Sequence, residues 1–304
     1  MLALIAPGQG AQTPGMLTPW IQDDLTKQLI AKWSEEINLD LLRLGTVADA
    51  DEIKDTANAQ PLIVAAGLLG ARTLNSRKLF SLVAGHSVGE ITAAALAGVI
   101  SEIDAMKLVR ARGIEMAKAA AVAPAGMSAV LGGDREIVLR AISDLGLVAA
   151  NDNGGGQIVA AGDLDALAQL SPEGARVRAL AVAGAFHTSY MEPAVAPLRT
   201  IAAAIQVHQP ICGVISNRDG AVIQDGREVL DRIVAQISNP VRWDLCMTTL
   251  SENVSGALEV PPAGTLVGLL KRAVPVVETF ALKSITDVTL ADEFIERHNQ
   301  ELIN

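Results

Sequence analysis

The chain has 304 residues, of which 50% are hydrophobic and 3% aromatic, and its formal net charge at pH 7 is −10. This length allows one large domain or two small ones, with a core built from Ala, Val, Leu and Ile. The acidic excess argues against nucleic-acid binding, which needs a basic face. The longest apolar runs, such as residues 61–71, are too short to cross a bilayer. We therefore expect neither nucleic acid nor a membrane among the partners of this protein.

The start of the chain and its cysteines indicate the compartment. No basic residue precedes Lys27, so the apolar first residues lack the charged region of a signal peptide. Cys212 and Cys246 lie in apolar surroundings without metal-ligand spacing. This predicts neither a disulfide framework nor a metal site, and we expect a cytoplasmic protein.

Residues 1–6 are predicted to form a buried strand that ends in Pro7-Gly8-Gln9-Gly10. A loop of that composition at the carboxyl end of a strand is where α/β proteins bind ligands. Apolar strands that alternate with Ala- and Leu-rich helices follow, which predicts the α/β fold class.

The most informative segment is Gly85-His86-Ser87-Val88-Gly89, between an apolar run at 79–84 and a helix-forming run at 90–97. Strand, Gly-x-Ser-x-Gly and helix in this order are typical of a nucleophile elbow. We expect Ser87 to be the nucleophile and the N–H of Val88, at a helix N-terminus, to be an oxyanion donor. The pattern also arises by chance in a chain this rich in glycine, and Ser87 would then be a small residue in a tight turn.

Residues 126–187 have a different pattern from the rest of the chain. The expected elements are strand 127–131, helix 134–145, strands 147–150 and 157–161, helix 163–170 and strand 176–182. The order βαββαβ is that of a ferredoxin-like domain. We therefore predict a core domain of residues 1–125 and 188–304, interrupted by a small domain of residues 126–187, with the ligand cleft between them.

A serine nucleophile needs a general base within hydrogen-bond reach. His86 adjoins Ser87, but neighbours on a sharp turn point apart, and His208 and His298 lie in polar segments that we expect to be solvated. His187 lies where the chain returns from the small domain to the core, at the mouth of the expected cleft. It is the candidate base, although a structural histidine at a domain junction explains the position too. Because no acid follows a strand as in a triad, a Ser–His pair oriented by a neutral group fits better.

Several short motifs occur together in a familiar order and at familiar separations. They are Pro7-Gly8-Gln9-Gly10, Gln60-Pro61, Gly85-His86-Ser87-Val88-Gly89-Glu90, Arg112-Gly113, Phe186-His187 and Asn239-Pro240-Val241. Through them, and over nearly its whole length, the chain resembles the malonyl-CoA:acyl-carrier-protein transacylases of type II fatty acid synthesis. This resemblance implies an α/β-hydrolase-like core with a ferredoxin-like insert, in agreement with the predicted elements.

The resemblance also implies a mechanism. Ser87 would take the malonyl group as an ester, with His187 as base and then acid. The backbone N–H groups of Gln9 and Val88 would form the oxyanion hole, and Gln236 would orient the histidine. Malonyl-CoA and acyl carrier protein would react in turn in a ping-pong mechanism that needs no cofactor. We expect a monomer.

The resemblance assigns the free malonyl carboxylate to Arg112. On a helix over 105–120, Arg112 lies about 60° from the centre of the apolar stripe, at the border between buried and exposed. An arginine there offers two parallel donors to a carboxylate and disfavours uncharged acyl groups. Arg112 could instead form a surface salt bridge, and we expect such a bridge for Arg110 on the other side of the helix.

Further substrate-binding residues expected from the family are Gln60, Met116 and Phe186. Phe186 before the histidine and an aliphatic Val88 after the serine accompany malonyl selectivity in related domains, although excluding one methyl group is worth only about 1–3 kcal/mol. Asn151 and Asn153 resemble family positions near the site, but turn formation explains them equally well. The chain departs from the family at 261–264, where Pro-Pro-Ala-Gly replaces a frequent Gly-Pro-Gly.

Basic residues near the cleft are needed if an acidic carrier protein docks there, and Lys271, Arg272 and Arg110 are the candidates. Three alternatives remain open. Acyltransferases of polyketide or malonate decarboxylase systems share the motifs. A serine esterase or thioesterase would need a triad acid and gives no reason for Arg112. A non-catalytic scaffold would be expected to lose Ser87, His187 or Arg112, and all three are present.

Overall fold

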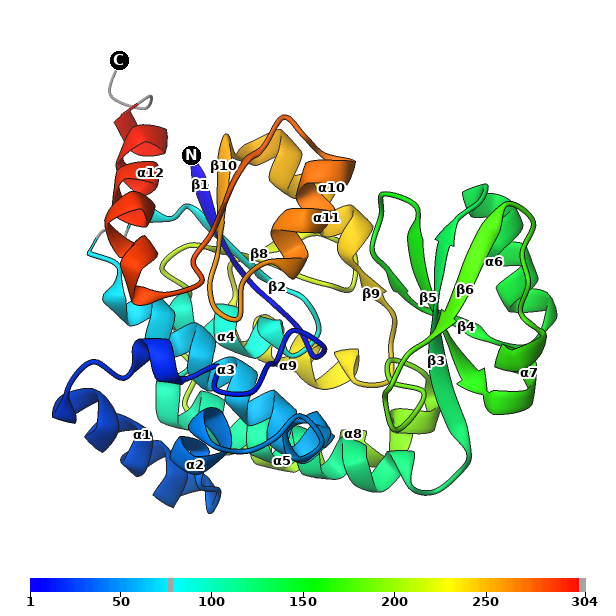
Figure 1. Ribbon diagram of the computed structural model, residues 1–304, viewed down its shortest axis with the longest axis horizontal. Helices are drawn as coiled ribbons and strands as arrows, with labels where there is room; N and C mark the ends of the chain where they lie inside the picture. The colour runs from blue at the N-terminus through cyan, green and yellow to red at the C-terminus, as the bar shows by residue number, and fades with distance from the viewer. Residues whose placement is uncertain (76–78, 301–304) are drawn as a thin grey trace.

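The computed structural model describes residues 1–75 and 79–300 and has a large part and a smaller lobe beside it (Figure 1). A six-stranded sheet lies at the centre of the large part, in the order β11-β10-β1-β2-β7-β8. Its neighbouring strands are parallel except β7 and β8, which pair antiparallel. The strands are β1 (Leu2–Ala6), β2 (Leu82–Gly85), β7 (Gly213–Ile215), β8 (Val222–Ile223), β10 (Gly256–Glu259) and β11 (Glu278–Ala281).

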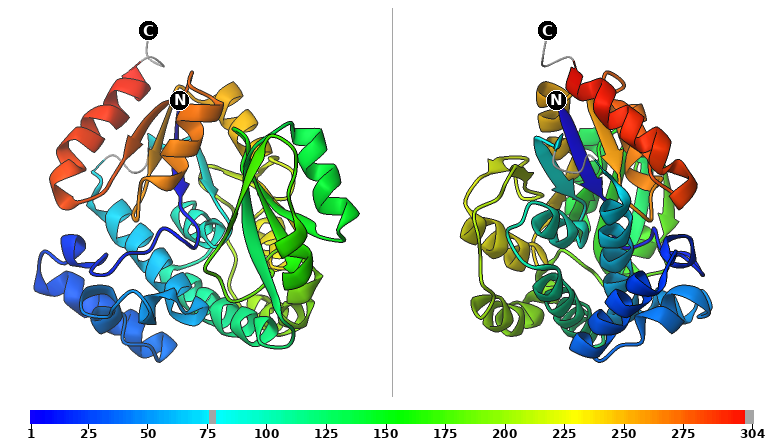
Figure 2. Two further views of the ribbon diagram at one scale, coloured as in Figure 1. Left: turned by 45° about the vertical axis from the view of Figure 1, so that its right-hand side comes forward. Right: turned by 90° about the vertical axis from the view of Figure 1, so that its left-hand side faces the viewer.

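Helices cover both faces of this sheet (Figure 2). They are α1 (Asp24–Ile37), α2 (Leu41–Thr46), α3 (Thr56–Thr73), α4 (Gly89–Leu96), α5 (Glu102–Ala120), α8 (Glu192–Ala203), α9 (Gly226–Gln236), α10 (Trp243–Asn253), α11 (Thr265–Ala273) and α12 (Val288–Gln300). Among the described residues, no helix is long and apolar enough to cross a membrane.

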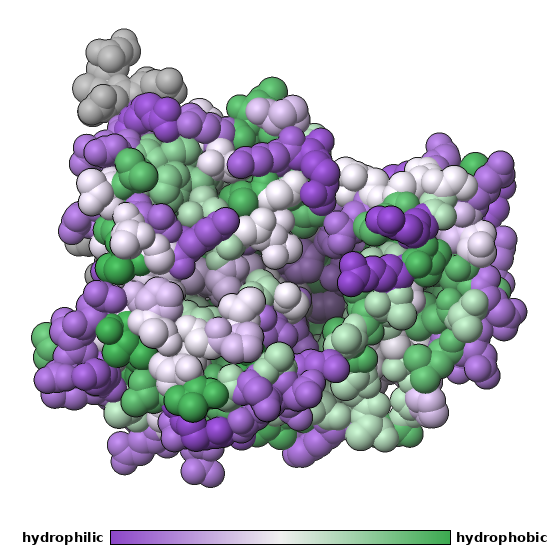
Figure 3. Space-filling model, in the orientation of Figure 1, coloured by the Kyte–Doolittle hydropathy of each residue, from purple (hydrophilic) through white to green (hydrophobic). Residues whose placement is uncertain are grey.

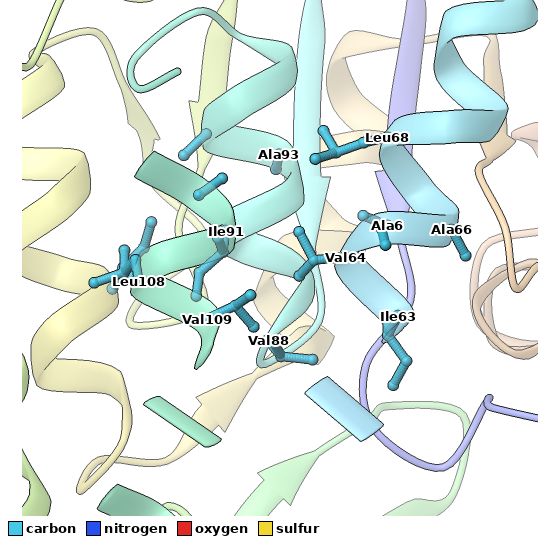
Figure 4. Close-up of a cluster of buried hydrophobic side chains, with 14 of the residues drawn as sticks. Ala6, Ile63, Val64, Ala66, Leu68, Val88, Ile91, Ala93, Leu108 and Val109 are labelled. Carbon is cyan, nitrogen blue, oxygen red and sulfur yellow. The ribbon is translucent and has the colours of Figure 1, made fainter. Parts of the chain in front are cut away.

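Alternate residues of β1 belong to different hydrophobic clusters, as expected for a strand that is buried on both faces. Leu2, Leu4 and Ala6 pack in the cluster that contains α3, α4 and α5. Figure 4 shows part of this cluster, including Val64 of α3 and Ile91 of α4. The intervening residues of β1 pack instead against α10 and α11 on the opposite face.

The smaller lobe contains the βαββαβ elements predicted for residues 126–187. They are β3 (Ala125–Gly132), α6 (Arg135–Asp144), β4 (Val148–Asp152), β5 (Gln157–Asp163), α7 (Leu164–Gln169) and β6 (Ala175–Ala179). The sheet order is β6-β3-β5-β4-β9, with α6 and α7 packed on one face. The fifth strand, β9 (Val241–Arg242), comes from the later part of the chain and pairs with β4, which the sequence did not predict.

The expectation that His298 is solvated is wrong. His298 is 6% exposed, and its ring lies against Phe294, with ring centroids 4.5 Å apart. Its nitrogens face Ser255 Oγ at 2.8 Å and a carboxylate oxygen of Glu278 at 3.1 Å. The charged neighbours of His298 in the sequence concealed the fact that one face of α12 packs on the sheet.

Candidate active site

β2 ends at Gly85 and α4 begins at Gly89, so Ser87 lies in the turn between them, as predicted. Ser87 has a φ of 53°, in the left-handed region that residues other than glycine rarely adopt. A Cβ at Gly85 would overlap Gly89, and a Cβ at Gly89 would overlap the carbonyl oxygen of Ala6. Close backbone approach therefore requires both glycines, and the turn they form holds Ser87 at the carboxyl end of β2.

The structure brings Ser87 and His187 together, although they are far apart in the sequence. Ser87 Oγ lies 2.7 Å from His187 Nε2, and His187 Nδ1 lies 2.8 Å from the backbone carbonyl oxygen of Gln236. Because a carbonyl oxygen can only accept, Nδ1 carries the proton and Nε2 is free to accept from the serine. No carboxylate of a described residue hydrogen-bonds to the ring, so a neutral group orients it. Gln236 was expected to orient the histidine, and the group that contacts the ring is its backbone carbonyl.

The surroundings of His187 keep its ring neutral. The side chain is 3% exposed, and burial together with the positive charge of Arg112 lowers the pKa of His187 from 6.5 to about 3. The free base, which is the form that removes a proton from a hydroxyl group, therefore predominates at pH 7.

Arg112 is 1% exposed, and the prediction that it lies at the border of the helix surface is wrong. The reason is the close packing of α3 on α5, where a Cβ at Gly113 would lie 2.9 Å from the carbonyl oxygen of Thr56. From the same helix α3, Gln60 Oε1 accepts a hydrogen bond from Arg112 Nη1 at 2.8 Å. Helical periodicity within α5 did not show that a second helix covers this side.

The other end of the Arg112 guanidinium faces Ser87 and Gln236. Nη2 donates to Gln236 Oε1 at 2.9 Å and to Ser87 Oγ at 3.3 Å. Burial lowers the pKa of Arg112 to about 10, so the group is still charged at pH 7. All of its described hydrogen-bond partners are neutral. A buried cation without a directly bound anion beside a serine is suited to receive a carboxylate.

A cavity of about 80 Å³ opens at Ser87 and His187 and includes the other predicted substrate residues, Gln60, Met116 and Phe186, in its lining. Gln60 Nε2 lies 3.6 Å from Met116 Sδ and 3.3 Å from Gln9 Oε1.

The two predicted oxyanion donors lie at this site, because Gln9 lines the cavity and Val88 follows the serine. Within the described residues, neither backbone N–H has a hydrogen-bond partner. The side chain of Val88 is fully buried in the core and does not line the cavity (Figure 4). The side chain of Val88 was expected to contribute to malonyl selectivity, but it is not part of the lining of this cavity.

A second cavity of about 410 Å³ adjoins the first, because both are lined by Gln9, His86, Asn151, Val159 and Leu180. It is bounded at the other side by residues of α11 and the loop before it, among them Gly264 and Arg272. Figure 3 shows a hollow between the large part and the smaller lobe, with hydrophilic residues around it. A long, thin substrate arm can therefore reach Ser87 from the surface.

The structure shows the contacts of three residues whose roles the sequence did not decide: His86, Asn151 and Arg110. His86 Nε2 lies 2.8 Å from Asn153 Oδ1, and the ring packs edge-on against Trp243. Asn151 Oδ1 is buried at the cavities without a described partner. Arg110 is half-buried and donates to the carbonyl oxygen of Ala57 at 2.7 Å, in place of a salt bridge.

Two buried residues next to the site were not predicted. Glu90 is 3% exposed and Asn217 is fully buried. Burial raises the pKa of Glu90 to about 8, and the backbone N–H of Asn217 and the charge of Arg112 oppose the rise. The position of Glu90 directly after Gly-x-Ser-x-Gly could have indicated that it lies near the serine. Nothing in the sequence indicates that Asn217 lies next to the serine.

The geometry places a serine hydroxyl group next to a neutral histidine and a buried arginine, and comparisons with known proteins give the class. A family model described as an acyl transferase domain matches residues 4–299. The malonyl CoA-acyl carrier protein transacylase of Mycobacterium tuberculosis H37Rv is 52% identical over 296 residues, 95% of this chain and 98% of that protein. The chain therefore belongs to the acyl transferase family, and it is an acyltransferase.

Other relatives narrow the likeness to one branch of that family. The enzyme of the same name from Mycolicibacterium smegmatis is 48% identical, over 91% of this chain and 100% of the relative. The crystal structure of MCAT from M. tuberculosis matches with a TM-score of 0.93 over 96% of this chain and 99% of that chain, at 52% identity. A further match is a chain from a structure described as a type II PKS acyl-carrier protein in complex with its malonyl-transacylase. It has a TM-score of 0.89 and 31% identity, over 96% of this chain and 99% of that chain.

Proposed function

We propose that this enzyme transfers the malonyl group of malonyl-CoA to the phosphopantetheine thiol of acyl carrier protein, through a malonyl ester on Ser87, for fatty acid synthesis. The observation that carries this proposal is the buried, charged Arg112, whose Nη2 lies 3.3 Å from Ser87 Oγ and whose described partners are all neutral. An acyl group that ends in a carboxylate supplies the missing anion. The names of the relatives support the same substrate.

In the first half-reaction, Ser87 Oγ attacks the thioester carbon while its proton moves to His187 Nε2. The N–H groups of Gln9 and Val88 stabilise the tetrahedral oxyanion, which is worth about 3–4 kcal/mol per donor in well-studied cases. The C–S bond then breaks, and the thiolate of CoA takes the proton from His187. Malonyl-Ser87 remains, with its carboxylate on Arg112.

In the second half-reaction, His187 takes the proton of the carrier protein's thiol, and the sulfur attacks the ester carbon. The C–O bond breaks, and the proton on His187 returns to Ser87 Oγ. The second cavity would hold the phosphopantetheine arm. Both steps balance without a metal or a cofactor. Among the described residues, His187 Nδ1 faces a backbone carbonyl oxygen where an esterase triad has an acid.

The proposal also includes the domain organisation, the oligomeric state and the compartment of the enzyme. We take residues 1–125 and 188–304 as an α/β-hydrolase-like core and residues 126–187 as a ferredoxin-like insert, with the cleft between them. We propose that the enzyme acts as a monomer in the cytoplasm.

Basic residues on both sides of the second cavity would receive an acidic carrier protein. Arg272 lines the cavity from α11, and Lys271 next to it is exposed. On the opposite side, strand register places Arg176 and Arg178 of β6 on the same face as Gln157 and Val159, which also line the cavity. Arg176, Arg178 and Arg272, which we call the basic rim, are exposed and have no ion-pair partner among the described residues. Arg110 is bound to a backbone carbonyl and is a weaker candidate.

The second half-reaction tests the function and the docking surface together. The enzyme is loaded with malonyl-CoA, freed of CoA, and mixed with holo acyl carrier protein or with free pantetheine. We expect rapid malonyl transfer to the wild-type carrier protein, and charge reversal (Arg178→Glu with Arg272→Glu) should slow this step about tenfold or more. Transfer to uncharged pantetheine should change little.

The matched control for the basic rim is Arg140→Glu, an exposed arginine on α6, which packs on the other face of the same sheet. An equal loss in this control, or an equal loss with pantetheine, would rule out docking at the basic rim. Release of malonate to water without transfer to a carrier protein would contradict the proposed function itself.

A further inference from the structure

The side-chain amide of Gln236 lies between Arg112 and the buried carboxyl group of Glu90. Gln236 Oε1 accepts from Arg112 Nη2 at 2.9 Å, and Gln236 Nε2 donates to Glu90 Oε2 at 2.6 Å. Gln236 is 5% exposed and Glu90 3% exposed, so water does not compete for these contacts. Arg112 and the carboxyl group of Glu90 are thus linked through a single amide group.

The amide can link them in only one orientation. Arginine has donors and no acceptor, so the end of Gln236 that faces Arg112 must be the oxygen. The other end of the amide is then the nitrogen, and Glu90 Oε2 accepts its hydrogen bond. If the amide turned over, its nitrogen would face the donors of Arg112. Its oxygen would face the acceptors Glu90 Oε2, the carbonyl oxygen of Ser87 and Asn217 Oδ1, and each such buried pair is costly.

Glu90 is itself held in place by the turn that carries Ser87. The backbone N–H of Asn217 donates to Glu90 Oε1 at 2.6 Å. The side chain of Asn217 receives the N–H of Ser87 at 2.8 Å and donates to the carbonyl oxygen of Gly85 at 2.7 Å. Both carboxyl oxygens of Glu90 thus accept from N–H donors, an arrangement that favours its ionised form against burial.

We propose that Glu90 is a positioning residue for acyl selectivity, because it accepts the shortest of the hydrogen bonds that hold the amide of Gln236 in the orientation that aims Arg112 at Ser87. The others go to the carbonyl oxygen of Ser87 and to Asn217 Oδ1. This inference rests on the proposed role of Arg112 toward the malonyl carboxylate. Glu90 has no contact with Ser87 Oγ among the described hydrogen bonds, and we assign its effect on Arg112 to its contact with Gln236.

Glu90→Gln tests this role because it keeps the shape of the side chain and inverts its polarity. Asn217 N–H still requires an oxygen at one end, so the new amide nitrogen faces Gln236 Nε2. This contact between two donors displaces the amide of Gln236 and weakens its hydrogen bond to Arg112. We expect the ratio of kcat/KM for malonyl-CoA to kcat/KM for acetyl-CoA to fall about tenfold or more.

Direct electrostatics predicts the opposite sign for this variant. Loss of the negative charge that Glu90 carries in its ionised form would by itself strengthen carboxylate binding and raise the malonyl-to-acetyl ratio. An unchanged or higher ratio in Glu90→Gln would therefore overturn the positioning role.

Gln236→Met provides a second test, which stands even if Glu90→Gln does not fold. It removes the linking amide and retains the backbone carbonyl that accepts from His187. We expect a similar fall in the ratio, and the double variant should lie within about twofold of Gln236→Met alone, because Glu90 acts through Gln236. An unchanged ratio in Gln236→Met, or additive effects in the double variant, would overturn the proposal.

Glu259→Gln is the matched control for loss of a buried carboxylate. Glu259 is fully buried and accepts the N–H groups of Gly264, Leu266 and Val267 at the start of α11. This control should lose stability and keep the malonyl-to-acetyl ratio. In the same assay, a wild-type enzyme without malonyl preference would contradict the proposed function. A collapse of the ratio in Arg112→Ala, with a normal ratio in Glu90→Gln, would remove only the present inference.

Discussion

Replacement of His187 with alanine is expected to slow the acylation of Ser87 by about 10³-fold or more. His187 Nε2 is the acceptor 2.7 Å from Ser87 Oγ, and without it the hydroxyl group has no base in contact. Stopped-flow release of CoA from malonyl-CoA measures this step directly. His86→Ala is the control, because His86 adjoins the serine in sequence but bonds to Asn153. A larger loss in His86→Ala than in His187→Ala would contradict the assignment of the base.

The same base predicts an unusual acid limb of the pH profile. The pKa of an ordinary histidine is 6.5, and burial with the nearby Arg112 lowers that of His187 to about 3. Since kcat/KM reports groups of the free enzyme, acylation should stay nearly constant from about pH 7 down to about pH 5.5. A fall with a midpoint near 6.5 would show that His187 is protonated in the free enzyme, contrary to its buried environment.

Arg112→Ala is expected to lower kcat/KM for malonyl-CoA by about 10²-fold or more, while kcat/KM for acetyl-CoA changes much less. In the wild-type enzyme an acetyl group leaves a buried guanidinium without an anion, and the alanine variant removes that penalty along with the contact. Competition between the two thioesters in one reaction gives the ratio without an error from enzyme concentration.

The matched control for Arg112 is Arg110→Ala, two positions away on the same helix. Arg110 is half-buried and donates to the carbonyl oxygen of Ala57, so its loss should affect stability and leave the malonyl-to-acetyl ratio unchanged. Equal changes of the ratio in both variants would mean that α5 acts through its packing and not through a charge at the serine.

Local sequence was enough to predict the strand, the turn and the helix around Ser87. Gly85 and Gly89 are required where the turn brings backbone atoms together, so the pattern around Ser87 has a steric cause that is visible in the sequence. The βαββαβ order was likewise predicted, because each strand and helix has its own period of apolar residues.

Features that depend on a second element could not be predicted in this way. The depth of Arg112 depends on α3, which covers one side of α5. The strand pairing of Val241 and Arg242 depends on an edge provided by β4. The contact of Gln236 with His187 uses a backbone carbonyl, which every residue type has, so the residue type could not indicate which atom orients the base.

In the proposed mechanism Ser87 carries the malonyl group, and the mass of the intact protein after incubation with malonyl-CoA tests this step most directly. We expect one malonyl adduct on the wild-type protein, found by peptide mapping on Ser87, absent from Ser87→Ala and formed much less with acetyl-CoA. An adduct that persists in Ser87→Ala, or a folded wild-type protein that forms none, would contradict it.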